Sequence, residues 1–427
     1  MQFADQEITW EKWDLHCGQG RIIFLGPQNV APPPPNDAIF LDTQGCFVLP
    51  GLINAHGHAA MTLFRGLADD LDLNTWLTKH MFVAERHLTP EAVYWGAMLA
   101  CVEMIKSGTT CFADMYLFAP SVAKAAQEAG LRAVSGEALF GFESLGYGNL
   151  DQGFALVKDF AAAFQNDERV RTSVHIHSIY TCSDSVIEKA ISLARQLNLS
   201  VHIHLSETQK EVRDCLEQNG CRPVEHLYKL GALYDQVWAA HGVWLTEAEM
   251  RILTNCGVGI AHCPVSNMKL TSGRLDLVNL LKYGIALGLG TDGCASNNRL
   301  DMFAEMDMFA KLHKLGSMDP AVAPAALALN MATKMGAQVI KWPELGELYL
   351  NGPADFIVVD FNQPHLTPVY NPVSHLVYAA RGADVRHTVC NGEILMRDRR
   401  LTRLNEQEIM AKVKEQALLV TGKALFK

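Results

Sequence analysis

Two histidines separated by one residue, His56 and His58, follow directly behind the apolar run CFVLP at residues 46–50. Residues two apart along a strand point to the same face, so both imidazoles would project from one side of the chain. Such a pair can bind a transition metal, or it can be two buried histidines that hydrogen-bond to the backbone. The pair by itself does not decide between these interpretations.

Further histidine and acidic residues stand at the ends of other β-rich runs. They are His204, Glu207, His241 and Asp292. Catalytic groups gather where the strands of a parallel barrel end, so we expect these side chains to meet. Three imidazoles and a carboxylate with an open position are typical of a catalytic zinc or iron site and not of a closed structural one.

The elements that would position these residues alternate along the chain after residue 51. Eight β-rich runs span residues 51–58, 108–116, 132–140, 170–178, 199–207, 236–243, 257–264 and 285–292, with helical stretches between them. In one stretch Thr89 can cap a helix that starts at Pro90. This alternation predicts an α/β fold, a parallel (β/α)₈ TIM barrel that forms the catalytic domain over residues 51–347.

The two ends of the chain have a different pattern. Residues 21–50 and 353–399 contain short apolar runs broken by turn residues, which predicts strands. We therefore predict one small β-sandwich module composed of residues 1–50 and 348–427 together. The APPPP stretch at residues 31–35 is interpreted as a stiff surface loop, because nothing aromatic or basic accompanies it as in a proline-rich ligand.

Composition limits the classes of partner. The 427 residues are 49% hydrophobic and 19% charged, with a net charge of -10 and no basic run, which predicts a globular protein that binds a small molecule and not nucleic acid. The 11 cysteines are odd in number and contain no C-x-x-C pair, which indicates reduced thiols and a cytoplasmic location. The opening MQFADQEITWEKWDLHCGQG has no signal-peptide pattern, and no apolar run reaches the ~18 residues of a membrane span. The sequence leaves open whether the chain forms a homo-oligomer.

Five motifs together resemble the amidohydrolase superfamily, and within it the 5'-methylthioadenosine/S-adenosylhomocysteine deaminases. The motifs are PGLINAHGHAAMTLFRGLADD, VHIHLSET, AAHGVWL, AHCPVSNMKL and GLGTDGCASNN. The resemblance implies one metal ion per chain, zinc with iron as the alternative, and four ligands: His56, His58, His204 and Asp292. It also implies that His241 orients the nucleophilic water, that Glu207 handles the proton of a purine ring, and that Asp292 transfers a proton.

The resemblance extends to residues that would bind a nucleoside. His177 in HIHSIYT matches the histidine of the fourth strand, and Glu85 matches the acid that holds the ribose hydroxyls; the alternative for Glu85 is a surface acid. Binuclear relatives carry a carboxylated lysine, usually on the fourth strand, and residues 170–178 contain none. Relatives that accept S-adenosylhomocysteine often have arginines after the third strand, and residues 141–154 contain none.

These features predict a metal-dependent hydrolytic deaminase that converts 5'-methylthioadenosine, S-adenosylhomocysteine or adenosine to the inosine analogue and ammonia. One alternative is an amidohydrolase acting on another nitrogen heterocycle, such as a chlorotriazine, a pterin or an oxidised guanine. A second is a noncatalytic scaffold of the same fold, which would be expected to lose metal ligands. His262 is interpreted as a structural residue or as one that supports a ligand.

Overall fold

The computed structural model describes residues 11–423. The first ten and last four residues of the predicted chain-end module lie outside the described residues, and so does the first half of the N-terminal stretch that lacks a signal-peptide pattern. Eight strands form one parallel sheet: β4 (Leu52–Gly57), β5 (Thr109–Tyr116), β6 (Arg132–Leu139), β7 (Val170–Ile176), β8 (Ser200–Leu205), β9 (Val237–His241), β10 (Gly259–His262) and β11 (Leu287–Leu289). Each pairs with its neighbours in the sequence. Just beyond β11, the backbone N–H of Asp292 donates to the carbonyl of His56 at 3.0 Å, which brings the last strand to the first. The predicted barrel is confirmed.

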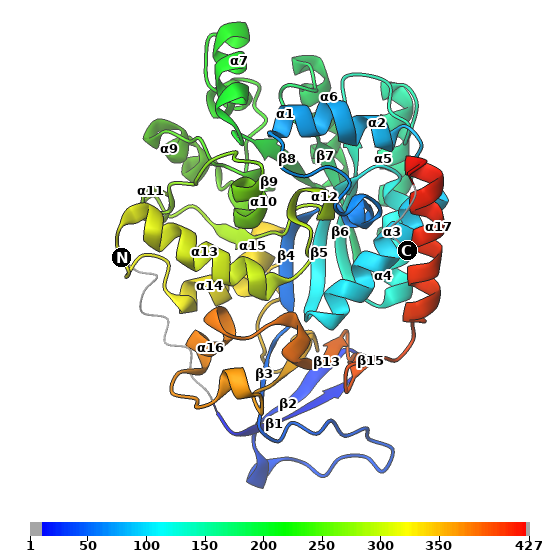
Figure 1. The fold of residues 1–427 in the computed structure, drawn as a ribbon, viewed down its shortest axis with the longest axis vertical. Helices are drawn as coiled ribbons and strands as arrows, with labels where there is room; N and C mark the ends of the chain where they lie inside the picture. The colour runs from blue at the N-terminus through cyan, green and yellow to red at the C-terminus, as the bar shows by residue number, and fades with distance from the viewer. Residues whose placement is uncertain (1–10, 424–427) are drawn as a thin grey trace.

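Helices surround this barrel (Figure 1). They are α3 (Pro90–Lys106), α4 (Ala119–Ala129), α5 (Leu150–Phe164), α6 (Asp184–Leu197), α7 (Gln209–Asn219), α8 (Pro223–Lys229), α9 (Glu247–Cys256), α10 (Pro264–Lys269), α11 (Leu277–Lys282), α12 (Cys294–Asn297), α13 (Met302–Ser317), α14 (Ala325–Met331) and α15 (Lys334–Val339). Helix α3 starts as the sequence predicts, with Thr89 as the N-cap and Pro90 in the first turn. The Thr89 hydroxyl accepts a hydrogen bond from the backbone N–H of Ala92 at 3.1 Å.

Replacing Thr89 with alanine should lower the free energy of unfolding by about 1 kcal/mol, because one N–H of the first turn loses its acceptor. Chemical denaturation of the two proteins measures the difference. Thr89→Ser keeps a hydroxyl and should retain most of the stability. An equal loss in both variants would show that the hydroxyl does not cap α3.

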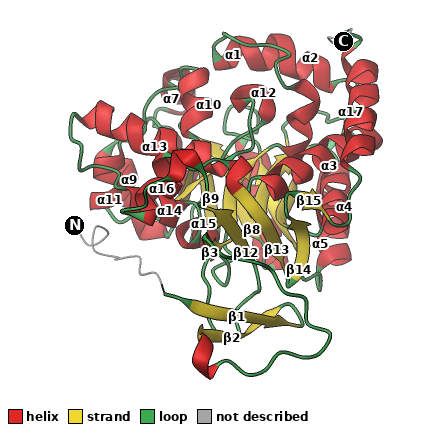
Figure 2. Ribbon diagram, turned by 60° about the horizontal axis from the view of Figure 1, so that its bottom comes forward, coloured by secondary structure: helices red, strands yellow, loops and turns green. Residues whose placement is uncertain are grey.

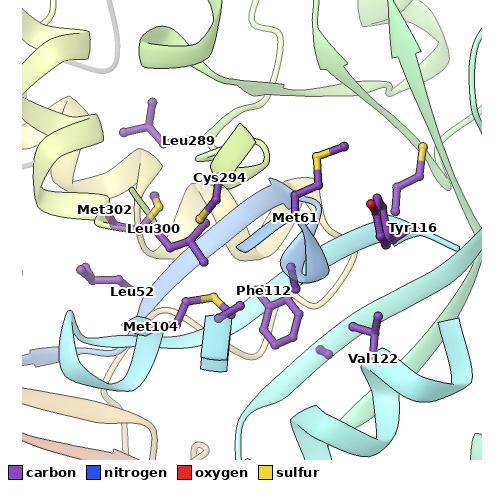
Figure 3. Close-up of a cluster of buried hydrophobic side chains, with 14 of the residues drawn as sticks. Leu52, Met61, Met104, Phe112, Tyr116, Val122, Leu289, Cys294, Leu300 and Met302 are labelled. Carbon is purple, nitrogen blue, oxygen red and sulfur yellow. The ribbon is translucent and has the colours of Figure 1, made fainter. Parts of the chain in front are cut away.

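The largest apolar core lies between the strands and the surrounding helices. Leu52, Phe112 and Met104 come from β4, β5 and α3 and are almost fully buried in it. Figure 3 shows these side chains together with Met61 and Cys294, which reach the same core from segments that follow β4 and β11. The core therefore packs against the strands whose ends carry the predicted ligands.

The chain ends build antiparallel sheets, as predicted. One has five strands in the order β15 (Arg400–Leu401), β14 (Glu393–Arg397), β13 (Val385–Cys390), β12 (Phe356–Asp360) and β3 (Cys46–Pro50), and the other pairs β1 (Trp13–Gly18) with β2 (Arg21–Pro27). Leu15 of β1 packs against Phe356, Val358 and Val389 of the larger sheet, so apolar side chains fill the space between the two sheets. Figures 1 and 2 show the β1–β2 hairpin at the far end of the molecule from α1 (Leu73–Trp76) and α2 (Phe82–Glu85).

Two helices of the C-terminal part pack on the barrel side. Helix α17 (Glu406–Thr421) lies along α3, and α16 (Pro372–Tyr378) contacts α14. The division of domains at residues 50 and 348 stays a prediction. Within residues 11–423, no helix combines the length and the apolar character needed to cross a membrane. All eleven cysteines lie in the described range and none forms a disulfide.

Candidate metal centre and substrate cleft

The predicted site residues converge at the carboxyl ends of the barrel strands. A cleft at this end is lined by His58, His204, His241, Asp292 and Glu207. The segment from α1 to α2, which includes a π-helical turn at Leu77–Met81, contributes the opposite wall. The structure thus brings all the predicted polar residues into one cavity, and it places His56 directly beneath them, fully buried.

Three of the predicted ligands form a compact group. His56, His58 and His204 each offer one atom, and these atoms lie within 4.8 Å of one another. His56 also groups with His241 and Asp292 under the same limit. Asp292 Oδ1 lies 3.1 Å from His58 Nε2 and 3.5 Å from His56 Nε2. Geometry therefore admits a divalent metal among these five side chains.

Hydrogen bonds to carbonyl oxygens set the tautomers of two ligands. His58 Nδ1 faces the carbonyl of Met115, and His204 Nδ1 lies 2.8 Å from the carbonyl of His177. A carbonyl only accepts, so Nδ1 carries the proton in each neutral ring and Nε2 keeps its lone pair. Both lone pairs are then available to a metal in the cleft.

A relay gives His56 the same tautomer. Its Nδ1 lies 2.8 Å from His202 Nε2, and His202 Nδ1 lies 3.2 Å from the carbonyl of Trp238. Because that carbonyl takes the His202 proton, His202 Nε2 accepts and His56 Nδ1 donates. His56 Nε2 is left buried with no hydrogen-bond partner. An orphaned buried nitrogen beside two further lone pairs and a carboxylate fits a bound metal ion.

Asp292 is held as an ionised carboxylate. Ser266 Oγ donates to its Oδ2 at 2.6 Å. Burial would raise its pKa, but the adjacent rings of His56 and His58 outweigh burial, and the pKa of Asp292 lies well below its usual value. Its backbone has a φ of +60°, and His241 has a φ of +73°. Non-glycine residues in this left-handed region are uncommon and concentrate at functional sites.

Glu207 is poised to hold a proton. Its Oε1 accepts from Ser272 Oγ at 2.8 Å, and its Oε2 lies 3.6 Å from His241 Nε2. Burial raises the pKa of Glu207, with the charge of His241 acting in the opposite direction. The backbone N–H groups of Ser206 and Glu207 both donate to the carboxylate of Glu211 at 2.7 Å, which fixes the turn that carries Glu207.

Glu85 faces the same cleft from α2 and does not lie on the outer surface. Tyr116, at the end of β5, donates its hydroxyl to Glu85 Oε1 at 2.8 Å. Burial raises the pKa of Glu85, and the hydrogen bond from Tyr116 lowers it. A carboxylate oxygen opposite this bond remains available to a ligand hydroxyl.

An aromatic wall borders His177, which lies one residue beyond β7. The ring centroid of Phe140 is 4.7 Å from that of His177 and 4.9 Å from that of Phe142. Phe82 lies 6.5 Å from both phenylalanines. No lysine or arginine from the described residues lines the cleft. The region after the third barrel strand thus presents aromatic rings where relatives were expected to present arginine.

Several contacting residues were not identified from the sequence. Tyr116 is the polar residue that ends β5, and the strand-end rule could have found it. His202 is fully buried and supports His56. Ser272 lies in a loop and Glu211 in α7, and no sequence pattern marks either residue as functional. His262 bonds to His313, with 3.1 Å between their Nε2 atoms, and stays outside the cleft.

A TIM barrel with imidazoles and a carboxylate gathered at its strand ends defines a metal-binding barrel of the hydrolase type. Comparison with known proteins is consistent with this class. Residues 47–395 match the model of the amidohydrolase family. The 5-methylthioadenosine/S-adenosylhomocysteine deaminase of Syntrophobacter fumaroxidans is 50% identical, over 92% of this chain and 90% of the relative. The 5'-deoxyadenosine deaminase of Methanosarcina mazei is 45% identical, over 88% and 87% of the two chains.

A solved structure agrees with these relatives. An adenosine deaminase from Xanthomonas campestris, crystallised with bound zinc, has a TM-score of 0.93 and 33% identity, and the match covers 97% of this chain and 95% of that one. The chain belongs to the amidohydrolase family and, within it, to the 5-methylthioadenosine/S-adenosylhomocysteine deaminases.

Proposed function

We propose that this protein is a metal-dependent deaminase that hydrolyses the amino group of 5'-substituted adenosines. The observation that carries the proposal is the shared cleft, which Glu207, Asp292 and Glu85 line together with the histidine group. A nucleoside needs polar partners for both its base and its ribose within one cleft. The names of the relatives support the same substrate class.

Each polar residue has a distinct task in the proposed reaction. A bound metal ion, for which we propose one zinc held by His56, His58, His204 and Asp292, would act as a Lewis acid toward the attacking water. Asp292 would take a proton from that water and pass it to the leaving ammonia. Glu207, whose pKa is raised by burial, would protonate the ring nitrogen next to the carbon that bears the amino group. As ammonia leaves, Glu207 would regain a proton from the added hydroxyl group, which becomes the carbonyl oxygen of the product.

The outer part of the cleft would hold the sugar. Glu85 would accept hydrogen bonds from the ribose hydroxyls, with Tyr116 fixing its carboxylate. His177 would contact the ribose side of the ligand beside Phe140. The apolar rings of this wall would accept a methylthio or methyl group at the 5' position more readily than a charged amino-acid tail.

Ammonia release from 5'-methylthioadenosine by the zinc-loaded protein tests the proposed reaction. The expected result is one ammonia for each molecule of inosine analogue formed. If ammonia did not form from any adenosine while zinc was bound, the proposed function would be wrong.

The order of preference among 5' substituents follows from the aromatic wall. We expect kcat/KM to be highest for 5'-methylthioadenosine, then S-adenosylhomocysteine, with adenosine close behind. The reason is that no cationic side chain lines the cleft to pair with the amino-acid carboxylate. Steady-state kinetics measures the ranking. A lead of more than about tenfold for S-adenosylhomocysteine, a difference of about 1.4 kcal/mol, would show that another group binds its tail.

The metal content should be close to one ion per chain. Strand β7 carries His177 after its last residue and contains no lysine to bridge a second metal. Elemental analysis after growth in zinc-supplemented medium is the measurement, and His204→Ala should lose most of the metal. Two ions per chain, or none, would contradict a mononuclear centre. Iron is the alternative ion, and the same analysis separates it from zinc.

A further inference from the structure

Contacts on opposite sides of the His241 ring determine which of its nitrogens carries the proton. On one side, Asn267 of α10 places its amide Nδ2 3.0 Å from His241 Nδ1. An amide nitrogen only donates, so His241 Nδ1 accepts and the proton resides on Nε2. On the other side, Nε2 lies 3.6 Å from Glu207 Oε2. When Glu207 is ionised, an N–H at this position is attracted to its oxygen, whereas a lone pair would be repelled.

The surroundings of the amide favour this orientation. Asn267 is fully buried, and its Oδ1 has no hydrogen-bond partner. With the amide reversed, Oδ1 would accept from His241 and the NH₂ group would be left with two unpaired N–H bonds at the position now held by Oδ1. One under-satisfied acceptor is less costly in a protein interior than two orphaned donors.

His241 therefore differs from the three histidines of the metal group. In His58 and His204, and in His56 through its relay, Nδ1 is the donor and Nε2 has the lone pair. Distance alone does not separate His241 from them, since it groups with His56 and Asp292 within 4.8 Å. A metal ligand needs a lone pair, and the contact with Asn267 turns His241 Nε2 into a donor.

We propose that Asn267 is a positioning residue that holds His241 as the Nε2–H tautomer. In this state His241 donates a hydrogen bond to the attacking oxygen and is kept from becoming an additional metal ligand. Asn267 itself does not touch the substrate. The role of the donated bond rests on the proposed deamination, but the tautomer can be measured without any turnover.

Nitrogen NMR of the zinc-loaded protein, labelled with ¹⁵N-histidine, tests the tautomer directly. The His241 signals are assigned by their loss in His241→Gln. We expect a protonated Nε2 and an unprotonated Nδ1. The reverse pattern in the unmodified chain would overturn the proposal, whatever the activity of the protein.

Asn267→Asp tests the consequence for catalysis. A carboxylate at this position accepts from Nδ1–H, so the proton should move to Nδ1 and kcat should fall about 100-fold, the loss typical of one misplaced donor to a developing oxyanion. The KM and the zinc content should change little. Asn267→Ala removes the donor without imposing the wrong tautomer, and it should lose less activity.

Asn371→Asp is the matched control for the change of amide to carboxylate. Asn371 caps α16 by accepting from the N–H of Ser374 at 3.1 Å, which a carboxylate does equally well. Unchanged kcat and tautomer in Asn267→Asp would overturn the proposal. If Asn267→Asp does not fold, Asn267→Ala and the spectrum of the unmodified chain decide. The unmodified chain and all variants could fail to deaminate any adenosine while the nitrogen spectrum shows a protonated His241 Nε2. That result would refute the proposed function and confirm the tautomer.

Discussion

Replacing Glu207 with glutamine should cut the turnover of 5'-methylthioadenosine by about 100-fold to 10,000-fold, the range typical of a lost general acid or base. The amide keeps the shape of the side chain and can still accept from Ser272, but it cannot deliver a proton to the ring nitrogen. Since Glu207 is not among the proposed ligands, the zinc content should not change. Measurement of kcat and zinc on the same preparation tests both statements.

Two variants serve as controls for this result. Glu143→Gln changes an exposed acid outside the cleft lining and should leave kcat unaltered. Asp292→Asn should also reduce turnover strongly, but with loss of metal, because its Oδ1 faces the ligand nitrogens. Near-normal turnover in Glu207→Gln would show that another group supplies the proton.

Nucleosides that lack ribose hydroxyls should be very poor substrates. A half-buried carboxylate that loses one hydrogen-bond partner is destabilised, and sites that hydrogen-bond a substrate hydroxyl can reject the analogue lacking it by factors of about 10,000. We expect 2'-deoxyadenosine and free adenine to fall toward this limit relative to adenosine. The measurement is kcat/KM for the three compounds.

The same comparison in Glu85→Ala shows whether Glu85 is responsible. In this variant kcat/KM for adenosine should fall, while kcat/KM for 2'-deoxyadenosine should change little. The ratio of the two values should therefore decrease. Tyr116→Phe removes the donor to Glu85 but keeps the carboxylate. Its ratio of kcat/KM for adenosine to that for 2'-deoxyadenosine should lie between those of the unmodified chain and Glu85→Ala. If 2'-deoxyadenosine were nearly as good as adenosine for the unmodified chain, Glu85 would not bind the ribose.

The positions of the strands could be predicted well from the sequence, but their ends could not. The last run was predicted over residues 285–292, and β11 spans only Leu287–Leu289. Asp292, three residues beyond the end of β11, has a left-handed backbone, which a regular strand does not adopt. His241 and Gly242 end β9 in the same way, with φ values of +73° and +61°. The functional strand ends are thus the places where regular periodicity stops.

The candidate ligands could be found because side-chain alternation and strand ends are local properties of a sequence. The supporting contacts are not local. His202 reaches His56 across 146 residues, and Asn267 reaches His241 from a helix that follows the next strand. The wall made by α1, the π-helical turn and α2 has too few residues per helix to give a clear periodic pattern. Helix α17 was likewise not anticipated beside α3.

Three properties expected from the sequence stay predictions. They are the cytoplasmic location, the absence of nucleic-acid and membrane partners, and the oligomeric state.

A comparison of kcat/KM across substrate classes for the zinc-loaded enzyme tests directly whether the chain is a deaminase of adenosines. The panel contains 5'-methylthioadenosine, S-adenosylhomocysteine and adenosine, with a chlorotriazine, a pterin and an oxidised guanine as controls. We predict that every adenosine is deaminated more efficiently than every control, because Glu85 and the aromatic wall bind a ribose and its 5' group. A control heterocycle that outperformed all three adenosines would contradict it.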